Sequence, residues 1–381
     1  MATALVNGIV FTSEHWLTNQ AVVIDEDKIT AVCPANDLPS QVANTIDLKQ
    51  QRLVPGFIDT QVNGGGGALF NDAPTLETLR IISEAHRAFG TTGFYPTLIS
   101  DNLEVMQAGI TAVKQAIKKK VPGVLGIHLE GPFLNPERKG VHDASKFKII
   151  DESAFQILTS LDIGKTLITL APELTTPEMI KRLINAGVIV SAGHSAATYE
   201  QTKIALASGL TSFTHLFNAM TPFTSREPGM VGAALEDKNS WCGIIADGFH
   251  VHPASLKIAY QAKTRGKIIL VTDAMPSVGA INKNFMLNGE LIRYDNGKLT
   301  TATGTLAGSD LTMISTVTNA ISFLDITLDE AIRMASTYPA AMMGEKYLGE
   351  IKAGYTASMI LIDDQNRVTR SWVNGRELTE N

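Results

Sequence analysis

The sequence predicts an α/β chain in two parts: a (β/α)₈, TIM-like barrel and a small β-sandwich domain built from both chain termini. Eight short apolar segments alternate with helix-like stretches in the middle of the chain, and strand-like segments recur at its two ends. The 381 residues, 44% of them hydrophobic, can bury a core large enough for more than one domain. We expect the sandwich over residues 1–52 plus 346–381, and the barrel over residues 53–345.

The terminal segments have the composition of short strands around polar turns. Near the start, residues 3–10 and 19–33 are rich in Val, Ile and Thr. Near the end, residues 358–363 and 368–376 have the same character, and Asn374-Gly375 is typical of a hairpin turn. Because the two ends of a domain often lie close together, both ends can form one β domain with the rest inserted between them.

The middle of the chain predicts the barrel. Strands buried on both faces are continuously apolar, and strands that alternate with helices form parallel sheets. The eight apolar segments cover residues 53–61, 92–97, 124–130, 167–173, 188–194, 212–215, 242–250 and 267–273. The clearest amphipathic stretches between them cover residues 103–119, 177–186, 199–208 and 253–264, and Pro177 and Pro253 suit first helical turns. Eight such units indicate a closed barrel, with an open doubly wound sheet as the alternative.

Composition excludes several classes of protein. The net charge is −6, with 32 basic and 38 acidic residues, which argues against a nucleic-acid protein with a broad basic surface. No apolar run approaches the roughly 20 residues that span a bilayer, and the first residues do not resemble a signal peptide. Only Cys33 and Cys242 are present, which suits a reducing compartment. We therefore expect a cytoplasmic protein that acts on a small molecule, with no nucleic-acid or membrane partner.

Polar residues gather at the ends of the predicted barrel strands. They are Asp59, Gln61, Glu130, Glu173, His194, His215, Asp247, His250 and Asp273. In a barrel, the carboxyl ends of the strands meet at one face, where active sites lie. The repeated placement of His and acidic residues at strand ends therefore predicts a catalytic centre.

Three of these residues form a metal-binding set. Glu130, His194 and His215 offer one carboxylate and two imidazoles, which suits a catalytic Zn²⁺ or a similar divalent ion with one position left for water. Such an ion lowers the pKa of its bound water towards about 7 and so supplies a nucleophile. Asp273 can accept the water proton as general base and return it as general acid to a leaving amine. The alternative for Asp273 is an N-cap on a following helix.

Specific motifs carry a resemblance to a known family. His128-Leu-Glu-Gly-Pro, Thr214-His-Leu-Phe-Asn-Ala-Met and Pro55-Gly-Phe-Ile-Asp stand in the expected order, and further matches extend over essentially the whole chain. The chain resembles the amidohydrolase superfamily and, within it, the family of N-acetylglucosamine-6-phosphate deacetylases. The resemblance implies metal-dependent hydrolysis of the acetamide of N-acetyl-D-glucosamine 6-phosphate, which gives D-glucosamine 6-phosphate and acetate in amino-sugar catabolism.

One departure from the wider superfamily concerns the first barrel strand. Many amidohydrolases carry His-x-His there, whereas this chain has Gln61-Val62-Asn63. Neutral amides are weak metal ligands, so we expect one divalent ion per subunit, held by Glu130, His194 and His215. Zn²⁺ is the expected ion, with Fe²⁺, Co²⁺ and Mn²⁺ as alternatives. Gln61 is then expected to support the site or hold water, or else to bond to backbone as an ordinary strand-end amide.

The resemblance also implies the substrate contacts. His142 would help to polarise the acetyl carbonyl, and Arg226 would bind the phosphate from a neighbouring subunit, which implies a homodimer or homotetramer. Val141 stands where relatives have Thr, so any hydrogen bond from that position must use backbone. The full set of expected substrate contacts is Val141, His142, Asn218, Ala219, Arg226, Asp247, His250, Leu306, Ala307 and Gly308.

Two other functions remain open at this point. One is a related amidohydrolase that acts on another amide, such as a cyclic imide or an N-acetylated amino acid. The other is a non-catalytic barrel that serves as an interaction scaffold.

Overall fold

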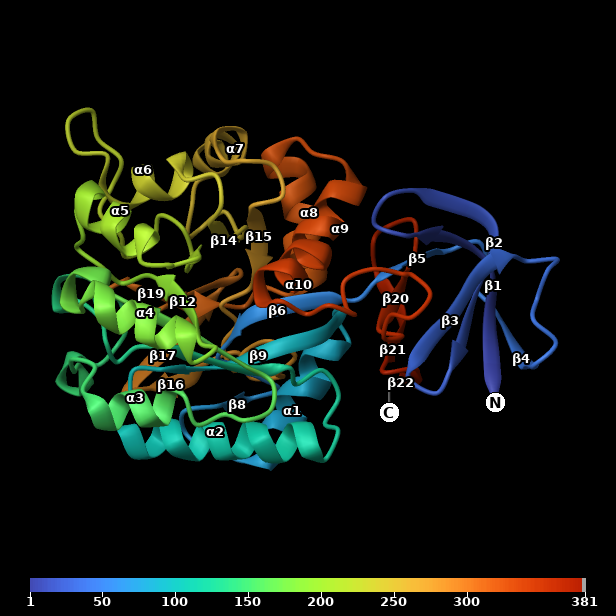
Figure 1. Ribbon diagram of the computed structural model, residues 1–381, viewed down its shortest axis with the longest axis horizontal. Coiled ribbons are helices and arrows are strands. Elements are labelled where there is room, and N and C mark those ends of the chain that lie inside the picture. The colour runs from blue at the N-terminus through green and yellow to red at the C-terminus, as the bar shows by residue number, and fades with distance from the viewer. Residues whose placement is uncertain (379–381) are drawn as a thin grey trace.

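The computed structural model describes residues 1–378 of the chain and shows two lobes (Figure 1). The larger lobe is a barrel of strands enclosed by helices, and the smaller lobe is built from strands of both chain ends. The N-terminus and the last described strand both lie in the smaller lobe. This arrangement confirms the predicted fold class.

The terminal sheet joins strands from the two ends of the sequence. Its strand order is β22-β21-β20-β5-β1-β2-β3, and β4 pairs with β1. The core of this lobe includes Leu5, Val22, Ile29 and Trp372. The strands are β1 (Ala2–Phe11), β2 (Trp16–Asp25), β3 (Lys28–Pro34), β4 (Val42–Asp47), β5 (Arg52–Pro55), β20 (Met359–Ile362), β21 (Val368–Val373) and β22 (Arg376–Leu378).

The chain passes from the terminal sheet to the barrel at Gly56. The single strand expected over residues 53–61 is in fact two strands, because β5 pairs with β1 and β20 whereas β6 (Phe57–Val62) pairs with a barrel strand. The boundary expected after residue 52 thus falls inside β5. A Cβ atom at Gly56 would lie 2.0 Å from Oγ1 of Thr92, so only glycine fits this crossing.

The barrel contains all eight strands that the sequence predicts. They run parallel in the order β15-β14-β13-β12-β11-β10-β9-β6. A parallel bridge between Val62 and Ala274 joins the two ends of this sheet, which excludes the open doubly wound alternative. After β6 the strands are β9 (Thr91–Ile99), β10 (Gly126–Glu130), β11 (Lys165–Leu170), β12 (Ile189–Ala192), β13 (Ser212–Phe213), β14 (Trp241–Ile245) and β15 (Ile268–Val271).

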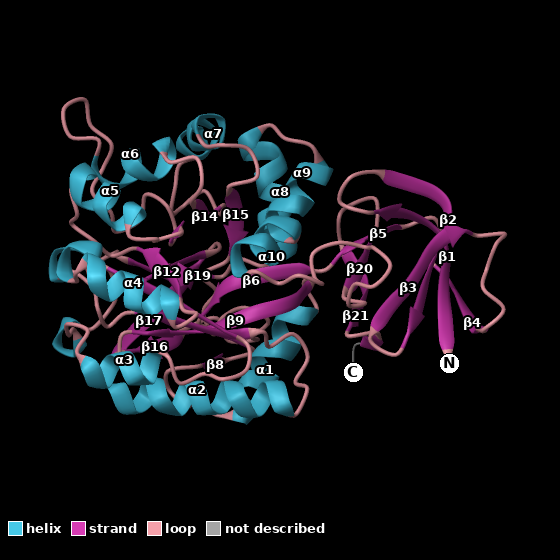
Figure 2. Ribbon diagram, viewed as in Figure 1, coloured by secondary structure: helices cyan, strands magenta, loops and turns pink. Residues whose placement is uncertain are grey.

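Helices cover the outside of the barrel (Figure 2). Side-chain oxygens cap several of their N-termini: Thr75 accepts a hydrogen bond from the Thr78 N–H, and Thr198 and Gln201 form a capping box. The helices are α1 (Leu76–Arg87), α2 (Leu103–Lys118), α3 (Glu152–Leu158), α4 (Pro177–Asn185), α5 (Tyr199–Ala207), α6 (Gly229–Glu236), α7 (Pro253–Ala262), α8 (Met313–Leu324), α9 (Leu328–Ala335) and α10 (Thr337–Met343). None of the helices in residues 1–378 is long and apolar enough to cross a membrane.

A small antiparallel sheet, which the sequence did not reveal, lies beside the carboxyl ends of the barrel strands. It consists of β16 (Phe285–Leu287), β17 (Glu290–Asp295), β18 (Lys298–Thr300) and β19 (Leu306–Ser309). Leu287, Ile292 and Leu299 pack with Met275 and Ile99, which follow or end barrel strands. A further short hairpin joins β7 (Gly64–Gly65) to β8 (Ala68–Leu69). The small sheet brings residues 304–308 to the mouth of the barrel.

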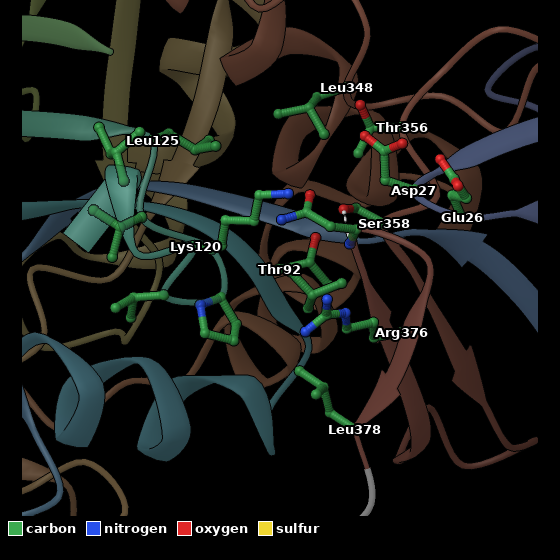
Figure 3. A pocket seen from close by; sticks show the side chains of 17 residues that line it. Glu26, Asp27, Thr92, Lys120, Leu125, Leu348, Thr356, Ser358, Arg376 and Leu378 are labelled. Carbon is green, nitrogen blue, oxygen red and sulfur yellow. Dashed lines mark hydrogen bonds between the residues drawn. The ribbon is translucent and has the colours of Figure 1, made fainter. Parts of the chain in front are cut away.

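A groove of about 740 Å³ separates the terminal sheet from the amino ends of the barrel strands (Figure 3). Lys120 and Arg376 line it together with Glu26, Asp27 and Thr92. Because active sites of barrels lie at the opposite, carboxyl ends of the strands, this groove is not the catalytic cavity.

Candidate metal centre

A cavity of about 360 Å³ opens at the carboxyl ends of the barrel strands. Most of the residues expected to act in catalysis line this cavity. The lining residues are Asn63, Ile99, Glu130, Gly140, Val141, His142, His194, His215, Asn218, Ala219, His250, Asp273, Met275, Gly304, Thr305, Leu306 and Gly308.

Three ligand atoms converge at the floor of this cavity. Glu130 ends β10, while His194 and His215 follow β12 and β13 by two residues each. Oε1 of Glu130 lies 2.9 Å from Nε2 of His215 and 3.3 Å from Nε2 of His194. The two Nε2 atoms are 3.1 Å apart, and all three side chains are buried. The three residues that the sequence named as metal ligands therefore lie together.

The chemistry of this group fits a divalent metal ion. Nδ1 of His194 lies 2.8 Å from the carbonyl oxygen of Arg138, which can only accept, so the proton sits on Nδ1 and Nε2 offers its lone pair. Burial alone would raise the pKa of Glu130, but the neighbouring imidazoles of His194 and His215 outweigh burial and hold the pKa well below its usual range. A carboxylate and two imidazoles are a common zinc ligand set with an open position.

Three residues of the site have a strained backbone. His194, His215 and Asp273 all have positive φ angles, of 48°, 36° and 53°. Non-glycine residues rarely adopt this conformation, and such residues cluster at active sites. The fold therefore holds these three side chains in place at a conformational cost.

Asp273 lies beside the metal-binding group and is bonded by two amides. Its Oδ1 atom accepts hydrogen bonds from Nδ2 of Asn63 at 2.7 Å and from Nε2 of Gln61 at 3.1 Å. Gln61 also donates to Oε2 of Glu130 at 3.1 Å, so its side chain bonds to carboxylates. Burial and the nearby charge of Glu130 raise the pKa of Asp273 to about 6, which suits proton transfer near neutral pH. The next described helix after Asp273 is α8, which begins only at Met313, so Asp273 is not an N-cap.

His142 is positioned as a neutral hydrogen-bond donor. The backbone N–H of Ser100 donates to Nδ1 of His142 at 3.2 Å, and Oγ of Ser100 lies 2.8 Å from the same atom. Because Nδ1 accepts, the ring proton sits on Nε2. Burial lowers the pKa of His142 to about 3, so the ring is uncharged. The rings of His142 and His194 are 4.4 Å apart, which places this donor next to the metal-binding group.

His250 is oriented by Asp247. Nδ1 of His250 lies 2.6 Å from Oδ2 of Asp247, while Oδ1 of Asp247 accepts from the backbone N–H groups of Phe249 and His250. Burial would raise the pKa of Asp247, yet these hydrogen bonds lower it below its usual value. His250 thus lines the cavity, and Asp247 reaches it only through His250.

The other expected contacts divide into two groups. Asn218, Ala219, Val141, Leu306 and Gly308 line the cavity. By contrast, Ala307 is fully buried among apolar side chains of the small sheet and does not line it. The carbonyl oxygen of Val141 accepts a hydrogen bond from Nδ2 of Asn288 at 3.1 Å, so its backbone is partly engaged.

Arg226 lies away from the cavity of its own chain. It is exposed in the loop before α6, which extends outward from the barrel in Figure 1. It makes no hydrogen bond or ion pair with another residue in the described part of the chain. Arg226 therefore does not line the cavity of its own chain.

Sequence reasoning missed Asn63 and Ser100, which bond directly to Asp273 and His142. Ser100 follows β9 by one residue, so the same strand-end rule that found Glu130 could have found it. Asn63 lies two residues beyond Gln61, and strand periodicity places both on one face. His128 and Glu173 instead support the site: His128 bonds to Thr169 inside the barrel, and Glu173 bonds to Ser195 beside His194.

Asp59 gives the first testable prediction. Burial, which outweighs hydrogen bonds from Thr272 and Gln61, raises the pKa of Asp59 from 3.8 to about 7. Between these values the folded protein binds more protons than the unfolded chain, so stability falls as pH rises. Between pH 5 and pH 8 the unfolding free energy of the wild type should fall by about 2 kcal/mol more than that of Asp59→Asn. Denaturant unfolding at both pH values measures this difference, and parallel pH curves for the two proteins would contradict it.

Comparison with known proteins agrees with the site. Residues 52–378 match the model of the Amidohydrolase family, and residues 3–53 match the NagA composite domain. An N-acetylgalactosamine-6-phosphate deacetylase from Shewanella sp. (strain ANA-3) is 47% identical over 86% of this chain and 83% of its own length. An N-acetylglucosamine-6-phosphate deacetylase from Haemophilus influenzae is 37% identical over 99% of both chains.

Solved structures show the same relationship. The crystal structure of N-acetylglucosamine-6-phosphate deacetylase from Pasteurella multocida superposes with a TM-score of 0.95, at 36% identity over 100% of both chains. The chain therefore belongs to the amidohydrolase family, among its deacetylases of amino-sugar 6-phosphates.

Proposed function

We propose that this protein hydrolyses the acetamide of N-acetyl-D-glucosamine 6-phosphate, giving D-glucosamine 6-phosphate and acetate. The convergence of Glu130, His194 and His215 beside Asp273 carries this proposal, because it places a metal-binding group next to a carboxylate that titrates near neutral pH. The names of the relatives supply the substrate class, a phosphorylated N-acetylated amino sugar.

Glu130, His194 and His215 would hold one divalent ion per subunit, and we propose Zn²⁺ on the basis of the ligand types. Such an ion supplies Lewis acidity that polarises the acetyl carbonyl and makes water a nucleophile at neutral pH. Fe²⁺, Co²⁺ and Mn²⁺ accept the same ligands, and adding each metal singly to chelated protein tests them.

The protein side chains then carry the proton transfers. Asp273 takes a proton from the attacking water as its oxygen bonds to the carbonyl carbon. The Nε2–H of His142 donates a hydrogen bond to the carbonyl oxygen, where negative charge develops. The carbon–nitrogen bond breaks as Asp273 returns the proton to the leaving nitrogen. The products are acetate and the free amine.

N-acetyl-D-galactosamine 6-phosphate is the second candidate substrate. A relative 47% identical to this chain bears the name N-acetylgalactosamine-6-phosphate deacetylase, whereas two relatives named for the glucosamine compound are each 37% identical. The two sugars differ only in the configuration at C4. The ratio of kcat/KM for the two compounds decides which is preferred.

A substrate panel tests the proposed function. We expect acetate release from at least one of the two sugar 6-phosphates, loss of that activity after chelation, and its return on adding single metals. Unphosphorylated N-acetylglucosamine, an N-acetylated amino acid and a cyclic imide should react poorly. Preferential cleavage of one of the last two would show another amidohydrolase activity, and no turnover of any compound by the metal-loaded protein would indicate a scaffold.

Arg226 is proposed to bind the substrate phosphate of a neighbouring subunit in a homodimer or homotetramer. Hydrogen bonds to a charged group contribute about 1.5–3 kcal/mol, so Arg226→Ala should lower kcat/KM on phosphorylated substrate about 10- to 100-fold. The kcat/KM of this variant on unphosphorylated N-acetylglucosamine should stay close to the wild-type value. Arg80→Ala, which removes an exposed arginine on α1, serves as the control. Equal losses on both substrates would contradict the phosphate role.

Mixing two impaired variants tests whether Arg226 acts across subunits. Arg226→Ala and Asp273→Asn each damage every site of their own homo-oligomer. In a mixed dimer, one site receives Arg226 from one chain and Asp273 from the other. Random mixing should restore up to about a quarter of wild-type activity. No recovery from a mixture that exchanges subunits would contradict action between subunits.

We propose that the protein acts in the cytoplasm. Both cysteines are free, and a phosphorylated sugar is the kind of substrate found in a reducing cytoplasm.

A further inference from the structure

Three polar side chains lie in a row on the inward face of β6 and the residue after it. Asp59, Gln61 and Asn63 stand at every second position, the spacing of side chains on one face of a strand, and their hydrogen bonds all reach the same neighbouring segment. Each bonds to the end of β15: Asp59 bonds to Thr272, while Gln61 and Asn63 both bond to Asp273. This row therefore supports the residue that transfers the proton.

Asn63 is held rigidly beside Asp273. Its backbone N–H donates to the carbonyl oxygen of Ala274 at 2.9 Å, and its own carbonyl accepts from the N–H of Phe70 at 2.9 Å. The bridge between Val62 and Ala274 closes the barrel at the same point. Asn63 is only 1% exposed, so packing and barrel closure together fix the place from which its amide reaches the carboxylate.

The two oxygens of Asp273 have different surroundings. Oδ1 accepts both amide hydrogen bonds, at 2.7 Å from Asn63 and 3.1 Å from Gln61. Oδ2 accepts no hydrogen bond from any described residue, and Asp273 lines the catalytic cavity. An oxygen that already accepts two N–H donors cannot be protonated without displacing one of them. The free oxygen is the better proton acceptor.

The conformation of Asp273 explains why such support is needed. Its φ angle of 53° is uncommon for a residue other than glycine and persists only when surrounding contacts enforce it. The amides of Gln61 and Asn63 fix its side chain, and the N–H of Ser309 donates to its carbonyl oxygen at 2.9 Å. Loss of one amide would leave the carboxylate free to rotate away from the reacting atoms.

We propose that Asn63 is a positioning residue for Asp273: with Gln61 it fixes Oδ1 and leaves Oδ2 to carry the proton. An O–H bond of water breaks as the Oδ2–H bond forms. The Oδ2–H bond then breaks as the new N–H bond forms and the carbon–nitrogen bond is cleaved. Oδ1 keeps both amide hydrogen bonds throughout. This inference rests on the proposed function and assigns a role to a residue that stands where many amidohydrolases have a metal-binding histidine.

A double-mutant cycle tests the role of Asn63. Asn63→Leu removes the amide that donates to Asp273 and keeps the same number of side-chain heavy atoms. It should lower kcat about 10- to 100-fold, because small displacements of a catalytic group cost factors of this size, while KM changes less than about threefold. In an Asp273→Asn background the same substitution should change the residual rate less than about twofold, because the positioned group is already absent. Asn63→Ala, which adds no bulk, replaces the leucine variant if that variant does not fold.

The control and the readouts separate positioning from damage to the fold. Gln156→Leu removes an amide bonded to a carboxylate, Glu152 on α3, far from the cavity, and should leave kcat unchanged. Metal content should stay at the wild-type value in Asn63→Leu. The solvent deuterium isotope effect on kcat should rise in this variant, because proton transfer then limits the rate more strongly.

Two outcomes would overturn the inference: an unchanged kcat in Asn63→Leu, or equal fractional losses in the wild-type and Asp273→Asn backgrounds. Either result with an active wild type leaves the proposed function standing. A wild type that releases no acetate contradicts the proposed function itself, so the two failures are distinguishable.

Discussion

Replacing Asp273 by Asn should lower kcat for acetate release by about 10²- to 10⁴-fold, the usual contribution of general acid–base catalysis. Asparagine cannot take a proton from water or return one to the leaving nitrogen. Its size is nearly unchanged, and its carbonyl oxygen can still accept from Gln61 and Asn63. The metal ligands and the sugar contacts should therefore remain in place.

Binding measurements separate this loss of chemistry from a loss of structure. Calorimetry should show that Asp273→Asn binds the sugar phosphate with an affinity close to that expected from wild-type KM, and metal analysis should show one ion per chain. Asp325→Asn, which alters an exposed carboxylate after α8, is the control. Turnover within a few-fold of wild type would show that Asp273 is not the proton-transfer group.

Removal of the metal should lower the rate of acetate release about as much as Asp273→Asn does. Lewis-acid stabilisation of several kcal/mol corresponds to about 10³-fold or more in rate, so chelated enzyme should be nearly inactive. His215→Ala should lose metal as well as activity, because it removes one of the three ligand atoms that converge in the described chain. Acetate release and metal content, measured on the same samples, should fall together.

An exposed histidine gives the matched control. His15→Ala alters a residue in the terminal sheet region and should keep both metal and activity. Full activity in protein shown by elemental analysis to be metal-free would contradict a metal-dependent mechanism.

The barrel could be predicted from sequence because each of its strands is buried on both faces. Continuous apolar runs such as those around Ile127 and Ile244 leave a signal that does not depend on distant residues. The strands of the small sheet left no such signal. In β17 only Ile292 is buried, so its sequence resembles that of an exposed loop. The crossing at Gly56 was also missed, because no turn separates β5 from β6.

The metal-binding group could be predicted because barrel topology brings strand ends together whatever their separation in sequence. The individual hydrogen bonds of the site could not be predicted from the sequence. The bonds from Asn63 to Asp273 and from Ser100 to His142 depend on how the barrel closes and where one loop returns. Ala307 follows a lining residue yet faces the packed interior, which only the pairing of β19 determines.

The most direct test of the central claim is anomalous X-ray diffraction at the zinc absorption edge, from crystals of protein loaded with one equivalent of Zn²⁺. We expect a single anomalous peak per chain in the cavity, about 2.0–2.2 Å from an oxygen of Glu130 and from Nε2 of His194 and His215. A peak that avoids any of these three side chains, or a second full peak bound by Asp273 and Gln61, would contradict the single metal centre described above.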